Sequence, residues 1–101
     1  MALTNVNAAA LKKISERFKA LGAPNRLKII SALKDGELSV SELVERTKLG
    51  QSNVSQHLKI LQNAGLVTNR KAGSLGLYRI ADETLYDLCS LVCTACQNGV
   101  D

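Results

Sequence analysis

The chain has 101 residues, of which 46% are hydrophobic and 22% are charged. This composition is typical of one small globular domain over residues 1–101, too short to bury a large core alone, which favours an oligomer. Thirteen Lys and Arg against nine Asp and Glu give a net charge of +4, which suits a polyanionic partner without requiring one. No apolar run reaches membrane length, and residues 1–10 lack the pattern of a signal peptide, so we expect a cytoplasmic protein without a membrane partner. Three cysteines within eight residues exclude the disulfide framework of a secreted scaffold.

Two amphipathic helices are expected in the first third of the chain. Over residues 7–21, apolar residues recur at helical spacing with Lys, Arg and Glu between them. Pro24 suits the first turn of a second helix to about Lys34, because a proline there loses no hydrogen bond. Asp35 and Gly36 close this second helix. The apolar positions of the two helices are Leu11, Ile14, Phe18, Leu21, Leu27, Ile29, Ile30 and Leu33.

A short third helix and a longer fourth helix follow, joined by a tight turn. Ser39 or Ser41 is placed to cap the third helix. Residues 49–50, Leu-Gly, predict the turn, and Gln51 or Ser52 is placed to cap the fourth helix. Two helices joined by a turn of about three residues that contains Gly constitute a helix-turn-helix.

The fourth helix combines one apolar stripe with a face of hydrogen-bonding side chains. Val54, Leu58 and Leu61, with Ile60 to one side, are expected to bury against the core. Amide and hydroxyl groups discriminate base edges in the major groove, whereas a merely solvated face more often carries Glu and Lys. The pattern therefore predicts a helix that reads double-stranded DNA. Its polar side chains are Gln51, Ser52, Asn53, Ser55, Gln56, His57 and Lys59.

After Gly65, which ends the fourth helix, the apolar spacing becomes strand-like. Residues 66–70 and 75–80 flank a loop over residues 71–74, whose glycine and small residues suit a hairpin turn. This hairpin is the wing of a winged helix, and its cations are placed to reach phosphates or the adjacent minor groove. Basic hairpins are also common as plain solvated surface, so this element alone adds little. The basic side chains are Arg70, Lys71 and Arg79.

A last helix is expected from Glu83 to Gln97, with Asp82 as its cap and Gly99 after its end. The predicted fold is therefore mainly α with a small β-hairpin, a winged helix-turn-helix. Apolar stripes on the first and last helices of a chain that is short for its core point to a dimer through these two helices. The stripe of the last helix contains Leu85, Leu88, Cys89, Val92, Cys93 and Cys96.

The order of elements and three strings of residues carry a family resemblance. These are FKALG followed by PNRL from Phe18 onward, SQHLKILQNAGLV over residues 55–67, and LYRI over residues 77–80. With them the chain resembles the ArsR/SmtB family of winged-helix repressors over nearly its whole length. The resemblance implies a homodimer, built by packing the first and last helices of two protomers, that stays on operator DNA until an inducer releases it. We expect no required cofactor.

Two metal sites of the family are absent from this sequence. Members that bind metal on the helix before the reading helix carry Cys-Val-Cys, where this chain has Ser-Val-Ser over residues 39–41. Members with a zinc site on the last helix use histidines with carboxylates, but the only histidine here is His57, on the reading helix. We interpret His57 as a DNA contact or an ordinary helix-surface residue.

The remaining candidates for a sensor are Cys89, Cys93 and Cys96, which share one side of the last helix at about 100° per residue. At about 1.5 Å rise per residue, Cys89 and Cys96 are about 10 Å apart along the axis, too far for both to bind one ion at about 2.3 Å. Neighbouring pairs are close enough, and the third thiol can join if the last turn unwinds or across the dimer. We therefore expect release by arsenite or another soft metal ion. A redox or sulfur-species switch and inert interface packing remain open.

Two other classes of function agree less well with the sequence than DNA binding does. An enzyme is not expected, because the lone His57 has no cysteine or carboxylate placed to activate a nucleophile. A winged helix that serves as a protein-interaction module is an alternative, since a fold does not fix a function. A protein partner would more often require exposed aromatic or leucine side chains than the neutral polar face of residues 51–59.

Overall fold

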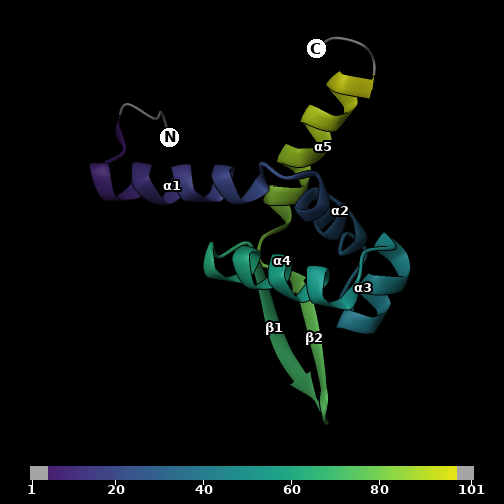
Figure 1. Ribbon diagram of the computed structural model, residues 1–101. Helices are drawn as coiled ribbons and strands as arrows, with labels where there is room; N and C mark the ends of the chain where they lie inside the picture. Colours follow the sequence, from purple (N-terminus) through teal and green to yellow (C-terminus); the bar gives the residue numbers. More distant parts are fainter. Residues whose placement is uncertain (1–4, 98–101) are drawn as a thin grey trace.

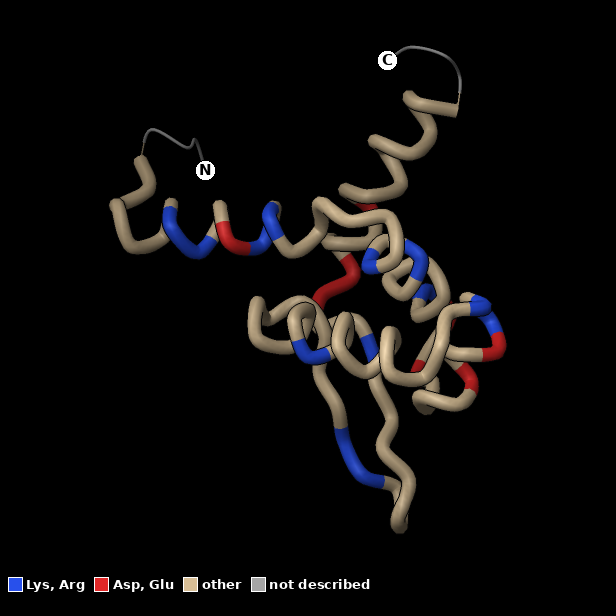
Figure 2. The backbone as a smooth tube through the Cα atoms, in the orientation of Figure 1, with Lys and Arg blue, Asp and Glu red and all other residues tan. Residues whose placement is uncertain are grey.

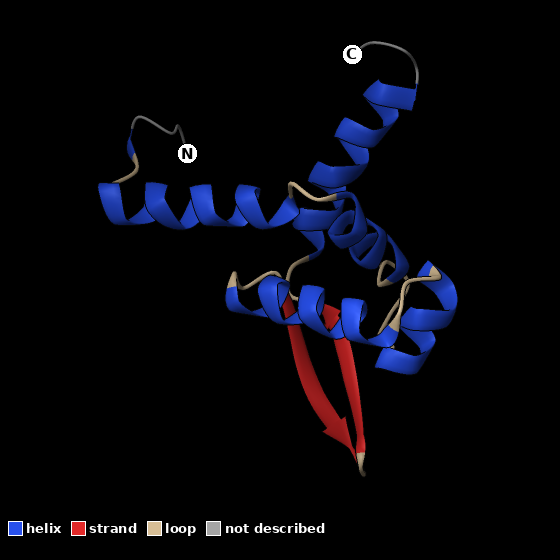
Figure 3. Ribbon diagram, viewed as in Figure 1, coloured by secondary structure: helices blue, strands red, loops and turns tan. Residues whose placement is uncertain are grey.

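The computed structural model describes residues 5–97, which form five α-helices and one antiparallel hairpin (Figures 1 and 3). The hairpin extends away from the helices, as a wing does. The mainly helical winged helix-turn-helix expected from the sequence is confirmed. The elements are α1 (Ala8–Leu21), α2 (Pro24–Ala32), α3 (Val40–Thr47), α4 (Gln51–Asn63), β1 (Val67–Ala72), β2 (Leu75–Ile80) and α5 (Glu83–Gln97).

Side-chain caps fix the starts of three helices. Asn7 precedes α1 and its carboxamide oxygen accepts a hydrogen bond from a first-turn amide. At α3, the Ser39 hydroxyl accepts from the Glu42 amide at 3.2 Å and the Glu42 carboxylate accepts from the Ser39 amide at 2.9 Å, a reciprocal capping box. Asp82 accepts from the amide of Thr84 at 3.0 Å at the start of α5. The expected caps Ser39 and Asp82 are confirmed.

The turn between α3 and α4 differs from the expectation. Gly50 occupies the N-cap position of α4, and within residues 5–97 no side chain caps this helix. Gln51 and Ser52 were wrong as caps because both already lie in the first turn. The left-handed residue of the turn is Lys48, with φ of 62°, whereas Gly50 has φ of −69°.

The wing is longer and its turn tighter than expected. Strand β1 includes Lys71 and Ala72, which the sequence placed in the loop, because they pair with Gly76 and Leu75. The connection is therefore the two residues 73–74, with Gly73 at φ of +67°, a conformation that suits glycine. The helix α2 also ends earlier, at Ala32, and residues 33–36 form a turn. The expected stop at Gly99 lies outside the described residues.

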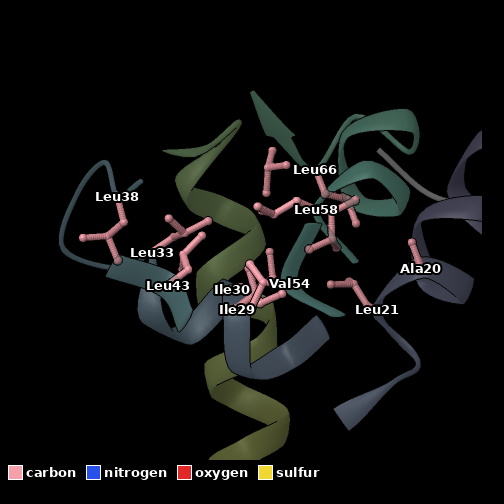
Figure 4. Close-up of a cluster of buried hydrophobic side chains, with 12 residues drawn as sticks. Ala20, Leu21, Ile29, Ile30, Leu33, Leu38, Leu43, Val54, Leu58 and Leu66 are labelled. Atoms are coloured by element: carbon pink, nitrogen blue, oxygen red, sulfur yellow. The ribbon is translucent and has the colours of Figure 1, made fainter. Parts of the chain in front are cut away.

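The core lies where α2, α3 and α4 meet the base of the hairpin (Figure 4). Burying each large aliphatic side chain there contributes about 1.5–3 kcal/mol. Two residues expected inside are exposed instead: Leu27 by 40% and Ile60 by 42%. The most deeply buried side chains are Ile29, Ile30, Leu33, Leu43, Val54, Leu58, Leu61 and Val67.

The helices α1 and α5 project away from this core (Figure 1). Of the apolar stripe expected on α1, Leu21 is buried but Leu11 and Phe18 are exposed. None of the α5 residues, all of them described, is buried, and Leu91 and Val92 are more than half exposed. Among residues 5–97, no helix is long and apolar enough to span a membrane.

Candidate nucleic-acid interface

The side chain of a threonine stabilises the turn that leads from α3 into α4. The Thr47 hydroxyl donates to the Leu43 carbonyl oxygen at 2.6 Å and accepts from the Leu49 amide at 3.3 Å. These two bonds connect the end of α3 to the turn that leads into α4. Sequence reasoning missed Thr47, although a threonine at the last position of a predicted helix is a recognisable signal for such a bond.

The helix α4 has the two faces expected from its spacing. Val54, Leu58 and Leu61 are at most 1% exposed and anchor the helix to the core. The opposite face presents amide, hydroxyl and ammonium groups, which can donate to and accept from base edges and phosphates. Its exposed members are Gln51, Ser52, Ser55, Gln56 and Lys59, and Asn53 and His57 are half-buried.

An arginine from α2 lies against α4. The Arg26 guanidinium is 3.4 Å from Nδ1 of His57, and its Nε donates to the carbonyl oxygen of Ala20 at the end of α1. Arg26 therefore connects three helices at the place where His57 is half-buried. A guanidinium this close disfavours a metal cation on His57. In the described part of the chain, no group of three His, Cys, Asp or Glu side chains could hold a metal ion.

The wing is connected to α4 by one side-chain hydrogen bond. Gln62 of α4 donates to the carboxamide oxygen of Asn69 at 3.2 Å. Successive residues of a strand point to opposite faces, so Lys71 shares a face with Asn69, on the α4 side. The adjacent residue, Arg70, lies on the opposite face of the hairpin, away from α4. Figure 2 shows a basic segment in the outer half of the hairpin, on β1.

The three wing cations therefore do not form one patch. Arg79 pairs across the sheet with Thr68, which places it on the face of Arg70. The Arg70 guanidinium donates two hydrogen bonds of 2.7 Å each to Glu37. The hydrogen bonding between the two side chains lowers the pKa of Glu37 and raises the pKa of Arg70. Sequence reasoning missed Glu37, which is 33 residues away from its partner.

The three cysteines of α5 differ in environment. Cys89 is half-buried against the core, whereas Cys93 and Cys96 are exposed. Burial raises the pKa of the Cys89 thiol, and the neighbouring Cys93 raises it further. All three thiols are free. Within one chain they do not form a three-ligand metal site, in line with the distance along the helix that the sequence predicts.

Comparisons with known proteins agree with this geometry. Residues 23–69, from α2 into β1, match the family described as bacterial regulatory protein, arsR family. An uncharacterised HTH-type transcriptional regulator of Methanocaldococcus jannaschii is 38% identical over 80% of this chain and 92% of its own length. An arsenical resistance operon repressor of Staphylococcus xylosus is 38% identical over 73% of this chain and 71% of its own. The chain spans 92% of the length of this Methanocaldococcus jannaschii relative but only 56% of that of an SmtB repressor of Mycobacterium tuberculosis.

A solved structure extends the similarity to the whole fold. The homodimeric winged helix-turn-helix DNA-binding domain of a possible ArsR-family transcriptional regulator from Mycobacterium bovis superposes with a TM-score of 0.82. The alignment covers 92% of this chain and 86% of that chain, at 32% sequence identity. The chain therefore belongs to the ArsR family of winged helix-turn-helix transcriptional regulators and is not an enzyme.

Proposed function

We propose that the protein is a repressor that binds operator DNA as a homodimer. The observation that carries this proposal is the exposed face of α4, which is made of short polar side chains on a helix whose other face is anchored in the core. Such a helix can enter the major groove without moving relative to the body. Gln56 and Ser55 are assigned to base edges, and Lys71 of the wing to phosphate. The other proposed contacts are Gln51, Ser52, Asn53, His57 and Lys59. Arg79 lies on the face of Arg70, away from α4, and is not assigned to DNA.

The homodimer is assigned to the apolar surface of α1 and α5. Phe18 is 57% exposed, Leu91 is 72% exposed and Val92 is 58% exposed. Large apolar side chains gathered on two projecting helices favour association with a matching surface. The homodimeric state of the related domain from Mycobacterium bovis supports the same assignment. A two-fold dimer would address a pseudo-palindrome through major grooves about 34 Å apart.

Two substitutions distinguish a contact to base edges from a contact to the phosphate backbone. Gln56→Ala should relax sequence preference and cost about 1–3 kcal/mol of binding to the preferred duplex, because it removes a base contact. Lys71→Ala should weaken all duplexes alike and reduce the slope of log affinity against log salt by about 1. Fluorescence anisotropy at several salt concentrations, on a duplex that the wild-type chain enriches from a random library and on a scrambled duplex, measures both effects. Unchanged preference in Gln56→Ala would contradict the assignment of the reading face.

We also propose that the inducer is arsenite or another soft metal ion bound by the α5 thiols. Cys93 is central, because Cys89 lies one turn before it and Cys96 follows three residues later on the same helix. The raised pKa of Cys89 disfavours a redox switch, which requires a thiolate, whereas a bound soft ion drives deprotonation itself. The similarity to an arsenical resistance operon repressor supports arsenite.

Arsenite should therefore release the protein from its duplex. An ion bound on the helix that forms the dimer would favour a protomer arrangement that no longer matches the groove spacing, and a coupling of about 1–3 kcal/mol suffices. Cys93→Ser should abolish the response, and Cys89→Ser or Cys96→Ser should show which partner is used. All three variants should keep the affinity measured without arsenite, because α5 does not belong to the reading face. Unchanged DNA binding of the wild-type chain under arsenite and other soft metal ions would refute this inducer.

A further inference from the structure

The segment before α3 contacts both strands of the wing. Leu38 and Tyr78 exchange two backbone hydrogen bonds, of 3.0 Å and 2.8 Å, so Leu38 extends the sheet next to β2 as a third strand one residue long. Glu37, the preceding residue, accepts both hydrogen bonds from Arg70 of β1. A backbone bridge and a bidentate ion pair therefore connect one short segment to both strands.

Arg70 points away from the face of the wing that contacts α4. Val67, at the start of β1, is 1% exposed in the core, and Asn69 bonds to Gln62 of α4. Since side chains alternate along a strand, Arg70 lies on the opposite face from these two residues and from Lys71. A phosphate contact made together with α4 would require the face of Lys71.

The Glu37–Arg70 pair is also the outermost bond between the wing and the body. In the part of the chain that the structure describes, no hydrogen bond connects the segment beyond it, residues 71–76, to a helix. Arg70 is 59% exposed and Glu37 is 27% exposed. An exposed ion pair contributes little to the free energy of unfolding. Two parallel hydrogen bonds from one guanidinium to one carboxylate nevertheless restrict the relative orientation of the two side chains. The pair is therefore placed to set the angle of the hairpin.

We propose that Arg70 is a positioning residue: held by Glu37, it orients the wing so that Lys71 meets the DNA backbone, and it does not contact phosphate itself. This inference rests on the proposed DNA-binding function. It separates Lys71, which would contact the DNA backbone, from Arg70, which would orient the hairpin, although the sequence grouped both with Arg79 as wing cations. It also gives Glu37, an acidic residue at a DNA-binding surface, a favourable role in binding.

A double-mutant cycle on the full chain tests the proposal with the enriched duplex. Glu37→Ala and Arg70→Ala should each weaken binding about three- to tenfold, and the double variant should be no weaker than either, because both remove one pair. The salt slope should stay at the wild-type value in all three. Lys71→Ala, on the same strand, is the matched control and should lower the slope by about 1.

Two further variants distinguish positioning from a plain structural or phosphate role. Arg70→Lys keeps the positive charge but cannot donate two parallel hydrogen bonds to the Glu37 carboxylate. This variant should therefore bind DNA as weakly as Arg70→Ala. The swapped pair, Glu37→Arg with Arg70→Glu, should restore binding to within about twofold of the wild type, because the ion pair re-forms. Circular dichroism should show that every variant is folded, and amide exchange over residues 70–77 should be faster in the single variants.

Opposite results would overturn the proposal. A salt slope lowered by about 1 in Arg70→Ala, together with tighter binding by Glu37→Ala, would make Arg70 a phosphate contact that Glu37 opposes. Additive losses in the cycle, or no rescue by the swapped pair, would overturn the positioning role alone. Absence of any duplex bound by the wild-type chain would instead overturn the proposed function, and this inference with it.

Discussion

At the scale of single residues, the capping box of α3 makes stability depend on pH. Hydrogen bonds from the Ser39 amide and hydroxyl lower the pKa of Glu42 below its ordinary value of 4.5. A carboxyl group whose pKa is lowered by folding stabilises the protein above its ordinary pKa, and this contribution is lost as pH falls through the folded value. The pKa values of Glu37 and Asp82 are lowered in the same direction.

Glu42→Gln should flatten this dependence. The carboxamide oxygen can still accept from the Ser39 amide but does not titrate, so the melting temperature should fall less than that of the wild type between about pH 5 and pH 3. Thermal unfolding followed by circular dichroism measures it. Glu45→Gln removes a charge from the same helix without touching the cap, and its pH dependence should match the wild type. An unaltered pH dependence in Glu42→Gln would show that the cap does not contribute.

The role of a single residue could be predicted from the sequence when its hydrogen-bond partner lies only a few residues away in the chain. Ser39 and Asp82 were found as caps because their hydrogen bonds span two or three residues. The partners Arg26 and His57 are 31 residues apart, and Glu37 and Arg70 are 33 apart. No local pattern brings such pairs together. For the same reason, the sequence could count the wing cations but could not say that Arg70 was already paired.

At the scale of elements, the turn of the helix-turn-helix carries backbone strain. Lys48 ends α3 in the left-handed region, with φ of 62°, which costs a residue with a side chain about 1–2 kcal/mol. Glycine adopts this conformation freely but loses about 0.5–1 kcal/mol to its greater freedom in the unfolded chain.

Lys48→Gly should therefore stabilise the protein by about 0.5–1 kcal/mol. Urea unfolding without DNA measures the change and keeps any loss of a DNA contact out of the result. Lys48→Ala removes the same charge but retains the strain, and its unfolding free energy should not rise. Equal effects of the two substitutions would assign any gain to charge rather than to backbone conformation.

The elements themselves were predictable where their apolar spacing was long and regular. The stripe of Val54, Leu58 and Leu61 gave both α4 and its polar face correctly. Boundaries were less accurate because they depend on backbone geometry. Because glycine is typical of tight turns, the sequence predicted the turn at residues 49–50, whereas the structure places its left-handed residue at Lys48. Similarly, the small residues of 71–74 suggested a loop, whereas the hairpin pairs as far as Ala72 and Leu75.

At the scale of the whole molecule, the two projecting helices need a partner for their apolar surface. Leu91→Glu places a charge where Leu91 is 72% exposed in the single chain, and burying that charge in a dimer would be costly. This variant should sediment as a monomer at micromolar concentrations, at which we expect the wild type to be a dimer. Leu75→Glu, near the tip of the wing and 51% exposed, should remain dimeric. Dimeric Leu91→Glu would show that the interface lies elsewhere.

The first half of α5 packs against the core through Leu85, Tyr86 and Cys89, whereas Leu91 and Val92 in its second half are more than half exposed, so the stability of the second half would depend on the concentration of a second copy. Helices owe most of their stability to packing, and packing supplied by a second copy contributes free energy that grows with the logarithm of chain concentration, about 1.4 kcal/mol per tenfold. The helix that carries the thiols would then fray in newly made, solitary chains and become ordered as copies accumulate.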